Sequence, residues 1–413
     1  MSNEDFVITL DIGSSQVRVI VAEVNADGTP HIVGVGTAES QGMKKGAIIN
    51  IDQAVQSIRE AVDHAERMVG IEISEVFVGV SGHHVSLQPS HGVVAVSSED
   101  REISLHDIDR VLQAARVIAL PPERAVIEVV PKQFIVDGLD DIKDPNGMVG
   151  VRLEVDAIIV TGTKTILTNL LRCVERAHLN IAGMVFLPLA VSELCLSDDE
   201  KNLGVVMVDM GGGTTTLTVY QHGHLAGTSV IPIGGEYITN DIAIGLRTQT
   251  SSAEDVKCKY GVACKEFALT DKMFNVQTIG TSRDRIVTQL ELAQIIEPRL
   301  EEMFQLIRQQ VKAMGFSDEP AGGYVLTGGV MATQHILHVA QNQLGGAVRI
   351  ATPQNIGVKE PSYTGGVGMI HYLHKRGAFQ TESNRTSHHP PRQKKQRGPS
   401  AFEKMKNWLN EFI

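Results

Sequence analysis

An aspartate that precedes a glycine turn between two apolar strands occurs twice in this chain, about half its length apart. Residues 6–24 alternate apolar and polar positions around Gly13-Ser14-Ser15, and residues 204–220 do so around Gly211-Gly212-Gly213-Thr214. This alternation around a turn of small residues predicts a β-hairpin in each place. Helical patterns follow at 52–68 and 238–247. The repeat therefore predicts a duplicated α/β chain with two similar lobes.

The 413 residues suffice for two lobes and additional smaller units. We expect the first lobe core at 1–83 and 164–195, with part of 360–376 added to it, and the second lobe core at 196–235 and 316–359. We expect a small inserted α/β unit at 84–163, a smaller subdomain of the second lobe at 236–315, a disordered basic linker at 377–399 and a terminal helix at 400–413.

Two helices have recognisable ends. Ser104 and Asp107 have the spacing of a capping box, which predicts a helix over 105–118. A longer apolar period predicts a helix from 289 to about 314, stopped by Gly315. Pro298 lies inside it and is expected to end or kink it locally.

Several protein classes are excluded by what the sequence lacks. The four cysteines form no CxxC pair, and no histidine is spaced along the sequence to complete a zinc site with them. Free thiols indicate a reducing cytosol. No run of 18 apolar residues and no signal-peptide layout is present, so we expect a protein that is neither secreted nor membrane-spanning. The net charge of −11 argues against nucleic-acid binding.

The two hairpins are candidates for a nucleotide site. Asp11 and Asp209 each stand at a strand end, where a carboxylate can hold a hydrated Mg²⁺ ion. Backbone N–H groups of the turn glycines, with the hydroxyls of the adjoining Ser and Thr residues, suit phosphate oxygens. An Asx-type structural turn explains either hairpin alone, whereas their repetition favours a functional pair.

Two further motifs suit a nucleoside. Gly328-Gly329 follows the apolar strand pattern of residues 324–327 and precedes a helix expected at 333–344, a step that can receive a phosphate or a purine. Glu254 and Lys257 lie three residues apart on one helix face and could reach a ribose and a base edge together, or could form only a solvated salt bridge. The motifs of P-loop and dinucleotide-binding proteins are absent.

Together these segments, with Gly365-Gly366, resemble the phosphate and adenosine motifs of the actin superfamily, in the same order across nearly the whole chain. The resemblance implies a duplicated actin-like (ribonuclease H-like) two-lobe ATPase fold that binds ATP and Mg²⁺. It assigns Asp11 and Asp209 to Mg²⁺ and the remaining positions to the nucleotide. Those positions are Gly13, Ser14, Ser15, Arg18, Gly211, Gly212, Gly213, Thr214, Glu254, Lys257, Gly328 and Gly329.

Within that superfamily the chain resembles the FtsA family of actin-like cell-division proteins, because of the inserted unit at 84–163 and the terminal segment. The resemblance implies a protein that polymerises on the cytoplasmic side of the cell membrane at the division site. There it would tether FtsZ during septum formation and contact later division proteins. It puts the site for the FtsZ C-terminal peptide at 236–315, where Arg299 and Arg285 could pair with a peptide carboxylate or be ordinary surface arginines.

One position departs from the hydrolytic members of the superfamily. Leu187 precedes Pro188 where chaperone-type ATPases carry a glutamate, and an aliphatic side chain cannot orient or deprotonate the attacking water. We therefore expect ATP binding with at most slow hydrolysis and assign no catalytic residue.

The last 14 residues predict an amphipathic helix. Ser400 and Glu403 have capping-box spacing, and residues 374–413 carry nine Lys or Arg against three Glu. On a helical projection an apolar arc of roughly 140° faces acidic and amide side chains. Such a helix beside a basic linker suits an anionic lipid surface, or could instead dock on the protein's own body. The predicted membrane contacts are Phe402, Met405, Trp408, Leu409, Phe412 and Ile413.

Three other functions share parts of this pattern. A sugar-type kinase of the superfamily would have both hairpins but does not account for the tail, and a chaperone ATPase would need a further substrate-binding domain. A pilus-type actin-like assembly protein would share the body. The terminal helix favours the cell-division interpretation.

Overall fold

The computed structural model describes residues 6–25, 29–280 and 284–377. The predicted linker, except for its first residue, and the whole predicted terminal helix, with its six proposed membrane contacts, lie outside these residues. Among the helices of the described residues, none combines the length and the apolar character that a membrane span requires.

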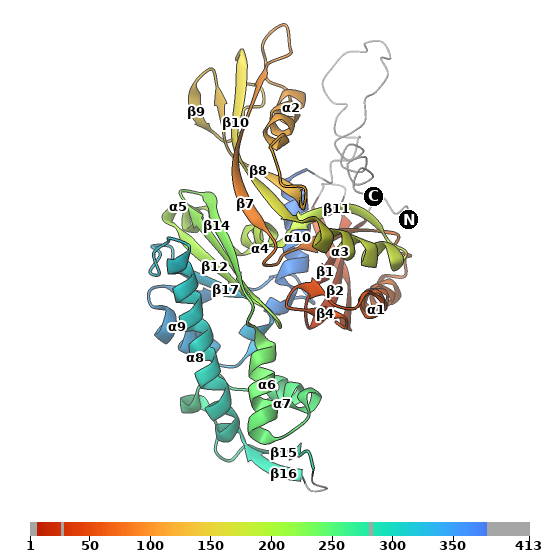
Figure 1. Cartoon of the computed structure of the whole chain (residues 1–413), viewed down its shortest axis with the longest axis vertical. Helices are drawn as coiled ribbons and strands as arrows, with labels where there is room; N and C mark the ends of the chain where they lie inside the picture. The colour runs from red at the N-terminus through yellow and green to blue at the C-terminus, as the bar shows by residue number, and fades with distance from the viewer. Residues whose placement is uncertain (1–5, 26–28, 281–283, 378–413) are drawn as a thin grey trace.

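Two five-stranded sheets with the same topology form the centre of the molecule (Figure 1), as the repeated hairpins predict. In each sheet a three-strand antiparallel meander is followed by two strands parallel to its first strand. The first sheet has the order β11-β6-β1-β2-β3, with β1 Phe6–Ile12, β2 Gln16–Val24, β3 Pro30–Glu39, β6 Glu75–Val80 and β11 Asn180–Phe186. The second has the order β14-β13-β12-β17-β18, with β12 Val205–Met210, β13 Thr215–Gln221, β14 His224–Ile231, β17 Tyr324–Thr327 and β18 Val348–Ile350.

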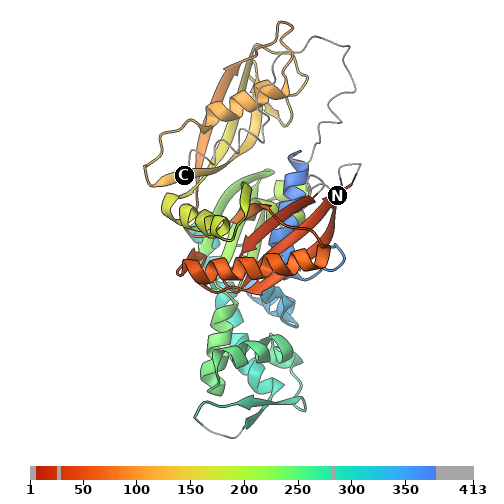
Figure 2. The same ribbon diagram turned by 90° about the vertical axis from the view of Figure 1, so that its right-hand side faces the viewer.

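Helices cover both faces of the first sheet. α1 (Ile51–Val69) and α3 (Lys164–Arg176) bury their apolar faces on one side, where α1 crosses the sheet in Figure 2. α4 (Leu187–Cys195) and α10 (Thr364–Lys375) lie between the two sheets. Successive side chains of β12 point to opposite faces of the second sheet. Val205 and Met207 join the core of α4 and α10, whereas Val206 and Val208 face the second lobe's own helices. The short elements of the two lobes are β4 Met43–Lys44, β5 Ala47–Ile48, α5 Asp198–Leu203 and η4 Pro361–Tyr363.

A separate four-stranded sheet rises from the first lobe (Figure 1) and has its own core. Its order is β7-β10-β8-β9, with β7 Ser86–Ala95, β8 Arg124–Val136, β9 Leu139–Ile142 and β10 Arg152–Thr163. α2 (Leu105–Arg116) packs on it. The sequence pattern predicts β7, β8, β10 and α2 but not β9, whose residues are mostly exposed and polar.

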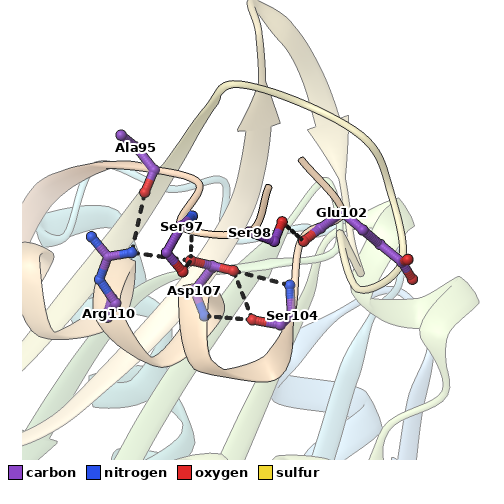
Figure 3. A network of polar contacts seen from close by, with 7 residues as sticks. All are labelled: Ala95, Ser97, Ser98, Glu102, Ser104, Asp107 and Arg110. Atoms are coloured by element: carbon purple, nitrogen blue, oxygen red, sulfur yellow. Dashed lines mark hydrogen bonds and ion pairs between the residues drawn. The ribbon is translucent and has the colours of Figure 1, made fainter. Parts of the chain in front are cut away.

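The predicted capping box of α2 is confirmed (Figure 3). Ser104 Oγ accepts from the Asp107 amide, and Asp107 Oδ2 accepts from the Ser104 amide and hydroxyl. Ser97 and Arg110 donate to Asp107 Oδ1. Burial would raise the pKa of this carboxyl, but the hydrogen bonds from Ser104 and Ser97 outweigh it and lower the pKa far below its ordinary value. The cap therefore joins α2 to the end of β7.

The smaller subdomain of the second lobe extends from the opposite end of the molecule (Figure 1). It contains α6 Gly235–Leu246, α7 Thr250–Tyr260, η2 Lys265–Phe267, β15 Met273–Gln277, β16 Asp284–Thr288 and α8 Gln289–Ala313. The predicted helix from 289 to about 314 is confirmed as α8. Of the two effects expected of Pro298, ending the helix does not occur, because α8 runs through the proline for 25 residues. Apolar side chains buried before and after the proline, including Ile296 and Leu300, hold both halves of α8 on one core.

The helix expected at 333–344 begins later than predicted. Gly328 and Gly329 lead into a short 3₁₀ turn, η3 (Gly329–Ala332), and α9 covers Ile336–Leu344. Its N-cap, His335, has φ 62°, a left-handed conformation that interrupts the helix before Ile336. The glycine pair is therefore followed directly by an irregular turn and not by the α-helix.

The C-terminal end of α10 is fixed to two other parts of the chain. Glu128 of β8 accepts from the Tyr372 hydroxyl at 2.6 Å and pairs with the Arg376 guanidinium at 2.5 Å. Lys375 pairs with Glu193 of α4. The inserted sheet, α4 and the last described helix are thus joined by charge-assisted contacts.

Candidate nucleotide site

The two aspartates occupy equivalent positions in the two sheets. Asp11 lies opposite Arg18 in the register of β1 and β2, and Asp209 lies opposite Thr216 in the register of β12 and β13. Each turn is closed in the same way, by Gly13 N–H donating to Gln16 O at 3.1 Å and by Gly211 N–H donating to Thr214 O at 2.9 Å. The predicted repeat of the aspartate hairpin is therefore confirmed in its backbone hydrogen bonds.

The turns of the two hairpins meet between the lobes. A Cβ atom added at Gly213 would lie 2.6 Å from Ser14 Oγ, and one added at Gly212 would overlap the Ser15 hydroxyl. The glycines permit this approach because no side chain stands between the two backbones. The structure thus brings the predicted phosphate-binding residues of both halves into one place.

The two carboxylates influence each other. Burial, and after it the charge of Asp11, raises the pKa of Asp209 to about 6. Burial also raises the pKa of Asp11, and the charge of Arg18 opposes this rise. Two acidic groups that disfavour each other's ionisation in a poorly hydrated place are suited to a divalent cation, which would relieve both effects.

Glycines stand beside both aspartates. A Cβ added at Gly365 in α10 would lie 2.7 Å from Asp11 Oδ2, and one at Gly328, where φ is +93°, would overlap Asp209 Oδ1. Any larger residue would therefore displace the carboxylate that we assign to Mg²⁺. Gly365 belongs to a motif seen in the sequence, but its contact with Asp11 joins segments more than 350 residues apart and has no local signal.

The positive charge of Arg18 lies close enough to Asp11 and Asp209 to oppose the rise in their pKa values. Its Nη2 donates to Gln16 Oε1 at 2.9 Å, and the guanidinium lies 5.6 Å from the centre of the Tyr363 ring. Its Nε is buried without a hydrogen-bond partner among the described residues. A buried donor without an acceptor suits an anion such as a phosphate oxygen. No local pattern predicts the contact between Arg18 and Tyr363.

The predicted nucleoside pair is assembled on α7. Lys257 Nζ lies 2.6 Å from Glu254 Oε2, and it donates to Thr239 Oγ1 at 2.8 Å. Burial would raise the pKa of Glu254, but the Lys257 charge and the hydrogen bonds to this carboxylate lower it. A Cβ at Gly235, the first residue of α6, would lie 3.2 Å from Val330 in η3 and 3.5 Å from Lys257 Nζ, so the Gly328-Gly329 turn borders this pair. Thr239 was not anticipated.

Leu187 lies in the same region as the aspartates. Its side chain lines a narrow crevice with Ser81 and Asp209, and its Cδ2 would be 3.6 Å from a Cβ at Gly365. The aliphatic group thus occupies the border of the site, and it offers no atom that could accept a proton from water.

The two predicted partner-binding arginines are not brought to this site, and both are paired. Arg299 on α8 makes a two-pronged contact with Asp241, at 2.5 and 3.2 Å, and also pairs with Glu302. Arg285 lies 3.3 Å from Glu291, and both of these side chains are well exposed. A peptide carboxylate would have to compete with these acidic side chains.

Comparison with known proteins agrees with the fold and the motifs. A family model described as "Cell division protein FtsA" matches residues 206–368, and a model described as "SHS2 domain inserted in FTSA" matches residues 82–161. The chain is 49% identical over 380 residues to the cell division protein FtsA of Bacillus subtilis, covering 92% of this chain and 86% of that protein. It is 33% identical to the FtsA of Escherichia coli, covering 94% and 95%.

Solved structures with less similar sequences share the fold. The PilM-PilN type IV pilus biogenesis complex matches with a TM-score of 0.60 and 17% identity, covering 90% of this chain and 98% of that one. MreB 5 of Spiroplasma citri bound to AMPPNP matches with a TM-score of 0.53 and 12% identity, covering 91% and 98%. The predicted two-lobe actin-like fold with an inserted subdomain is therefore confirmed, and the identities to the curated relatives show that the chain belongs to the FtsA family of cell division proteins.

Proposed function

We propose that this chain binds ATP and Mg²⁺ between its two aspartate hairpins, polymerises on the inner face of the cytoplasmic membrane and tethers FtsZ there during septum formation. The observation that carries the proposal is the meeting of the two glycine turns beside Asp11 and Asp209, where burial, and after it the charge of Asp11, raises the pKa of Asp209 to about 6. The guanidinium of Arg18 gives further support for a triphosphate. Its buried Nε has no hydrogen-bond partner among the described residues and could donate to a phosphate oxygen.

In this proposal the nucleotide spans the lobes. Asp11 and Asp209 hold Mg²⁺ mainly through water, and the turn amides, the Ser and Thr hydroxyls and Arg18 hold phosphates. Glu254 and Lys257 hold the ribose and the base beside Gly328 and Gly329. The AMPPNP bound to the MreB 5 neighbour of the same fold agrees with this assignment. Hydrolysis is slow at most because Leu187 offers no general base.

Membrane attachment in this proposal depends on assembly. One tail buries six large apolar side chains only partly, against the cost of ordering the helix, so a single copy binds lipid weakly. A filament carries many tails, and each tail that is bound raises the effective concentration of the next one at the membrane. ATP would thus control membrane attachment indirectly, because it would favour the closed form that assembles.

The test is sedimentation of the full chain with anionic liposomes, with and without ATP and Mg²⁺, beside a chain truncated after Gln380. We expect pelleting with liposomes only when both the tail and the nucleotide are present. Trp408→Glu should abolish it, whereas Asn407→Glu, the same change on the opposite helix face, should leave most of it. A nucleotide-bound monomer that attaches as tightly as the assembled form would contradict the coupling.

The FtsZ contact is tested separately with the C-terminal peptide of FtsZ. In this proposal the peptide carboxylate exchanges with Asp241 for the Arg299 guanidinium, so Arg299→Glu should weaken peptide binding about tenfold or more. Arg285→Glu should have a smaller effect because that pair is more exposed. Arg308→Glu is the matched control, since Arg308 also lies on α8 and is paired, with Asp318. Unchanged binding by the Arg299 variant would remove the assignment.

A further inference from the structure

A thiol, a carboxylate and an imidazole from two separate segments converge on the second lobe, away from the aspartate hairpins. The ligand atoms of Cys264, Glu266 and His338 all lie within 4.8 Å of one another. Cys264 and Glu266 belong to the η2 segment, and His338 belongs to α9. No spacing rule predicts this group, because His338 follows Cys264 by more than 70 residues and only the fold joins them.

The distances are close to those that a tetrahedral metal ion requires. His338 Nε2 lies 3.6 Å from Glu266 Oε2, and Cys264 Sγ lies within 4.8 Å of the ligand atoms of both residues. With bonds of about 2.3 Å to sulfur and about 2.0 Å to nitrogen or oxygen, two ligands of a tetrahedral Zn²⁺ ion stand roughly 3.3 to 3.6 Å apart. Only small side-chain movements would therefore be needed.

The backbone around these side chains is fixed. The Ala263 amide donates to Gln334 O at 2.9 Å, and the Lys265 amide donates to Glu297 Oε2 at 3.0 Å. The Phe267 ring stacks on His335 and meets the His338 ring edge to face, with centroids 4.4 and 5.2 Å apart. Such outer contacts restrict the orientation of a ligating side chain before a metal arrives.

Access and ligand chemistry also fit a metal. Cys264 is buried, whereas the side chains of His338 and Glu266 are 40% and 68% exposed, so an ion could enter from solvent and reach the sulfur. Asn342 Nδ2 lies 3.2 Å from His338 Nε2, which suits the tautomer whose Nε2 carries no proton, and a metal bound to Nε2 would replace this hydrogen bond. Thiolate, imidazole and carboxylate together select Zn²⁺ over Mg²⁺ or Ca²⁺.

We propose that Cys264, Glu266 and His338 form a Zn²⁺ site, with solvent as the fourth ligand. The thiol proton that Cys264 donates to Glu297 in the metal-free chain would be released when the ion binds. The ion would fasten the segment after α7, which belongs to the smaller subdomain of the second lobe, to α9.

The experiment uses the full chain, freed of metal and supplied with Mg²⁺ and ATP, and titrated with Co²⁺ as a spectroscopic substitute for Zn²⁺. We expect a thiolate-to-cobalt charge-transfer band that saturates at one ion per chain and disappears when Zn²⁺ is added. The aspartate hairpins offer oxygen ligands only, so any ion bound there gives no such band.

Variants identify the ligands. Cys264→Ser should abolish the band, and His338→Gln should weaken Co²⁺ binding about 100-fold while leaving a weak thiolate band. Cys258→Ser is the matched control, because that cysteine is exposed and lies six residues away, and it should behave as the parent. His338 is partly exposed, so its variant tests the site even where the Cys264 variant fails to fold. Absence of the band in the parent, or parent-like binding by the His338 variant, would overturn the proposal.

Discussion

The two aspartate hairpins have the same backbone and different side chains. The first places Arg18 opposite its aspartate and carries serine hydroxyls in its turn, whereas the second places Thr216 opposite its aspartate and has three glycines. Burial raises the pKa of both aspartates and the charge of Arg18 opposes both rises, but only at Asp209 does the charge of the other aspartate add to the rise. A duplicated scaffold has thus become asymmetric: the first hairpin supplies a guanidinium and serine hydroxyls, and the second supplies a turn of three glycines with one threonine hydroxyl.

The neighbouring helices continue the asymmetry. α1 is capped by a side chain, since Asn50 Oδ1 accepts from the Gln53 amide at 3.2 Å. α6 has no side-chain cap, and its first amides, those of Gly235 and Glu236, donate to the carbonyls of Gly211 and Gly212, each at 2.9 Å. The cap of α1 is therefore formed within its own segment, whereas the start of α6 is hydrogen-bonded to the glycine turn of the proposed nucleotide site.

The largest expected effect concerns Asp209, whose pKa is raised. The pKa of Asp209 is about 6 in the folded chain and 3.8 when unperturbed, so the folded state retains a proton that the unfolded state has released between these pH values. Its contribution to stability is therefore present below pH 3.8 and lost as the pH rises through 6. By pH 7 this loss amounts to about 3 kcal/mol. Asp209→Asn should then be more stable than the parent at pH 7 without nucleotide.

Denaturant unfolding at pH 4 and pH 7 checks this, with Asp11→Asn as the comparison. The gain for the Asp209 variant should be small at pH 4 and large at pH 7, and the Asp11 variant should also gain stability because burial raises the pKa of Asp11. A gain for the Asp209 variant that does not grow between pH 4 and pH 7 would contradict the raised pKa. Both should bind Mg²⁺ and ATP less tightly than the parent.

The second effect concerns the residues opposite the aspartates. Arg18→Ala removes a buried charged donor proposed to contact phosphate, so ATP affinity should fall about 10- to 100-fold, as expected for a charged hydrogen bond. Thr216→Ala, at the equivalent register position, should change it less than about threefold. Calorimetric titration of both variants measures the difference, and similar losses would mean that the two positions have equivalent roles.

The third effect concerns the contact between the turns. Gly213→Ala would place a methyl group 2.8 Å from Ser14 Cβ and should lower the free energy of unfolding by about 1.5 kcal/mol. Ser14→Gly removes that obstacle, so the double variant should recover most of the loss. Strict additivity in this double-mutant cycle would show that the turns do not approach each other in solution.

The smallest effect concerns the helix caps. Asn50→Ala should lower the free energy of unfolding by about 1 kcal/mol and leave ATP affinity unchanged, because this cap lies apart from the site. Gln249→Ala is a suitable control, since Gln249 is the N-cap of α7 but makes no capping hydrogen bond. A weaker ATP affinity for the Asn50 variant would mean that the start of α1, like the start of α6, contributes to the nucleotide site.

Local patterns predicted what depends on neighbours in sequence. The hairpins follow from alternation and glycine turns, the pair Glu254 and Lys257 from helical spacing, and the cap of α2 from Ser104 and Asp107. These succeed because strand pleat, helix pitch and capping act over a few residues.

Contacts between distant segments were not predictable. The positions of Tyr363 beside Arg18 and Gly365 beside Asp11 depend on how α10 enters the first lobe, and Asp241 meets Arg299 only because α6 packs on α8. Pro298 does not end its helix for a related reason. Burial along α8 compensates for one lost hydrogen bond, and a sequence pattern does not report that burial.

The attachment of α10 has a mechanical consequence. Residues 378–413 continue from this helix, so any tension on the proposed membrane tail would enter the body at Lys375 and Arg376. Their partners are Glu193 in α4 and Glu128 in the inserted sheet, and the helix itself lies between the two large sheets. A pull along α10 would load all of these contacts together, because they hold the same helix. The fold would thus pass force from the proposed membrane tail into both lobes through a helix packed between the two large sheets.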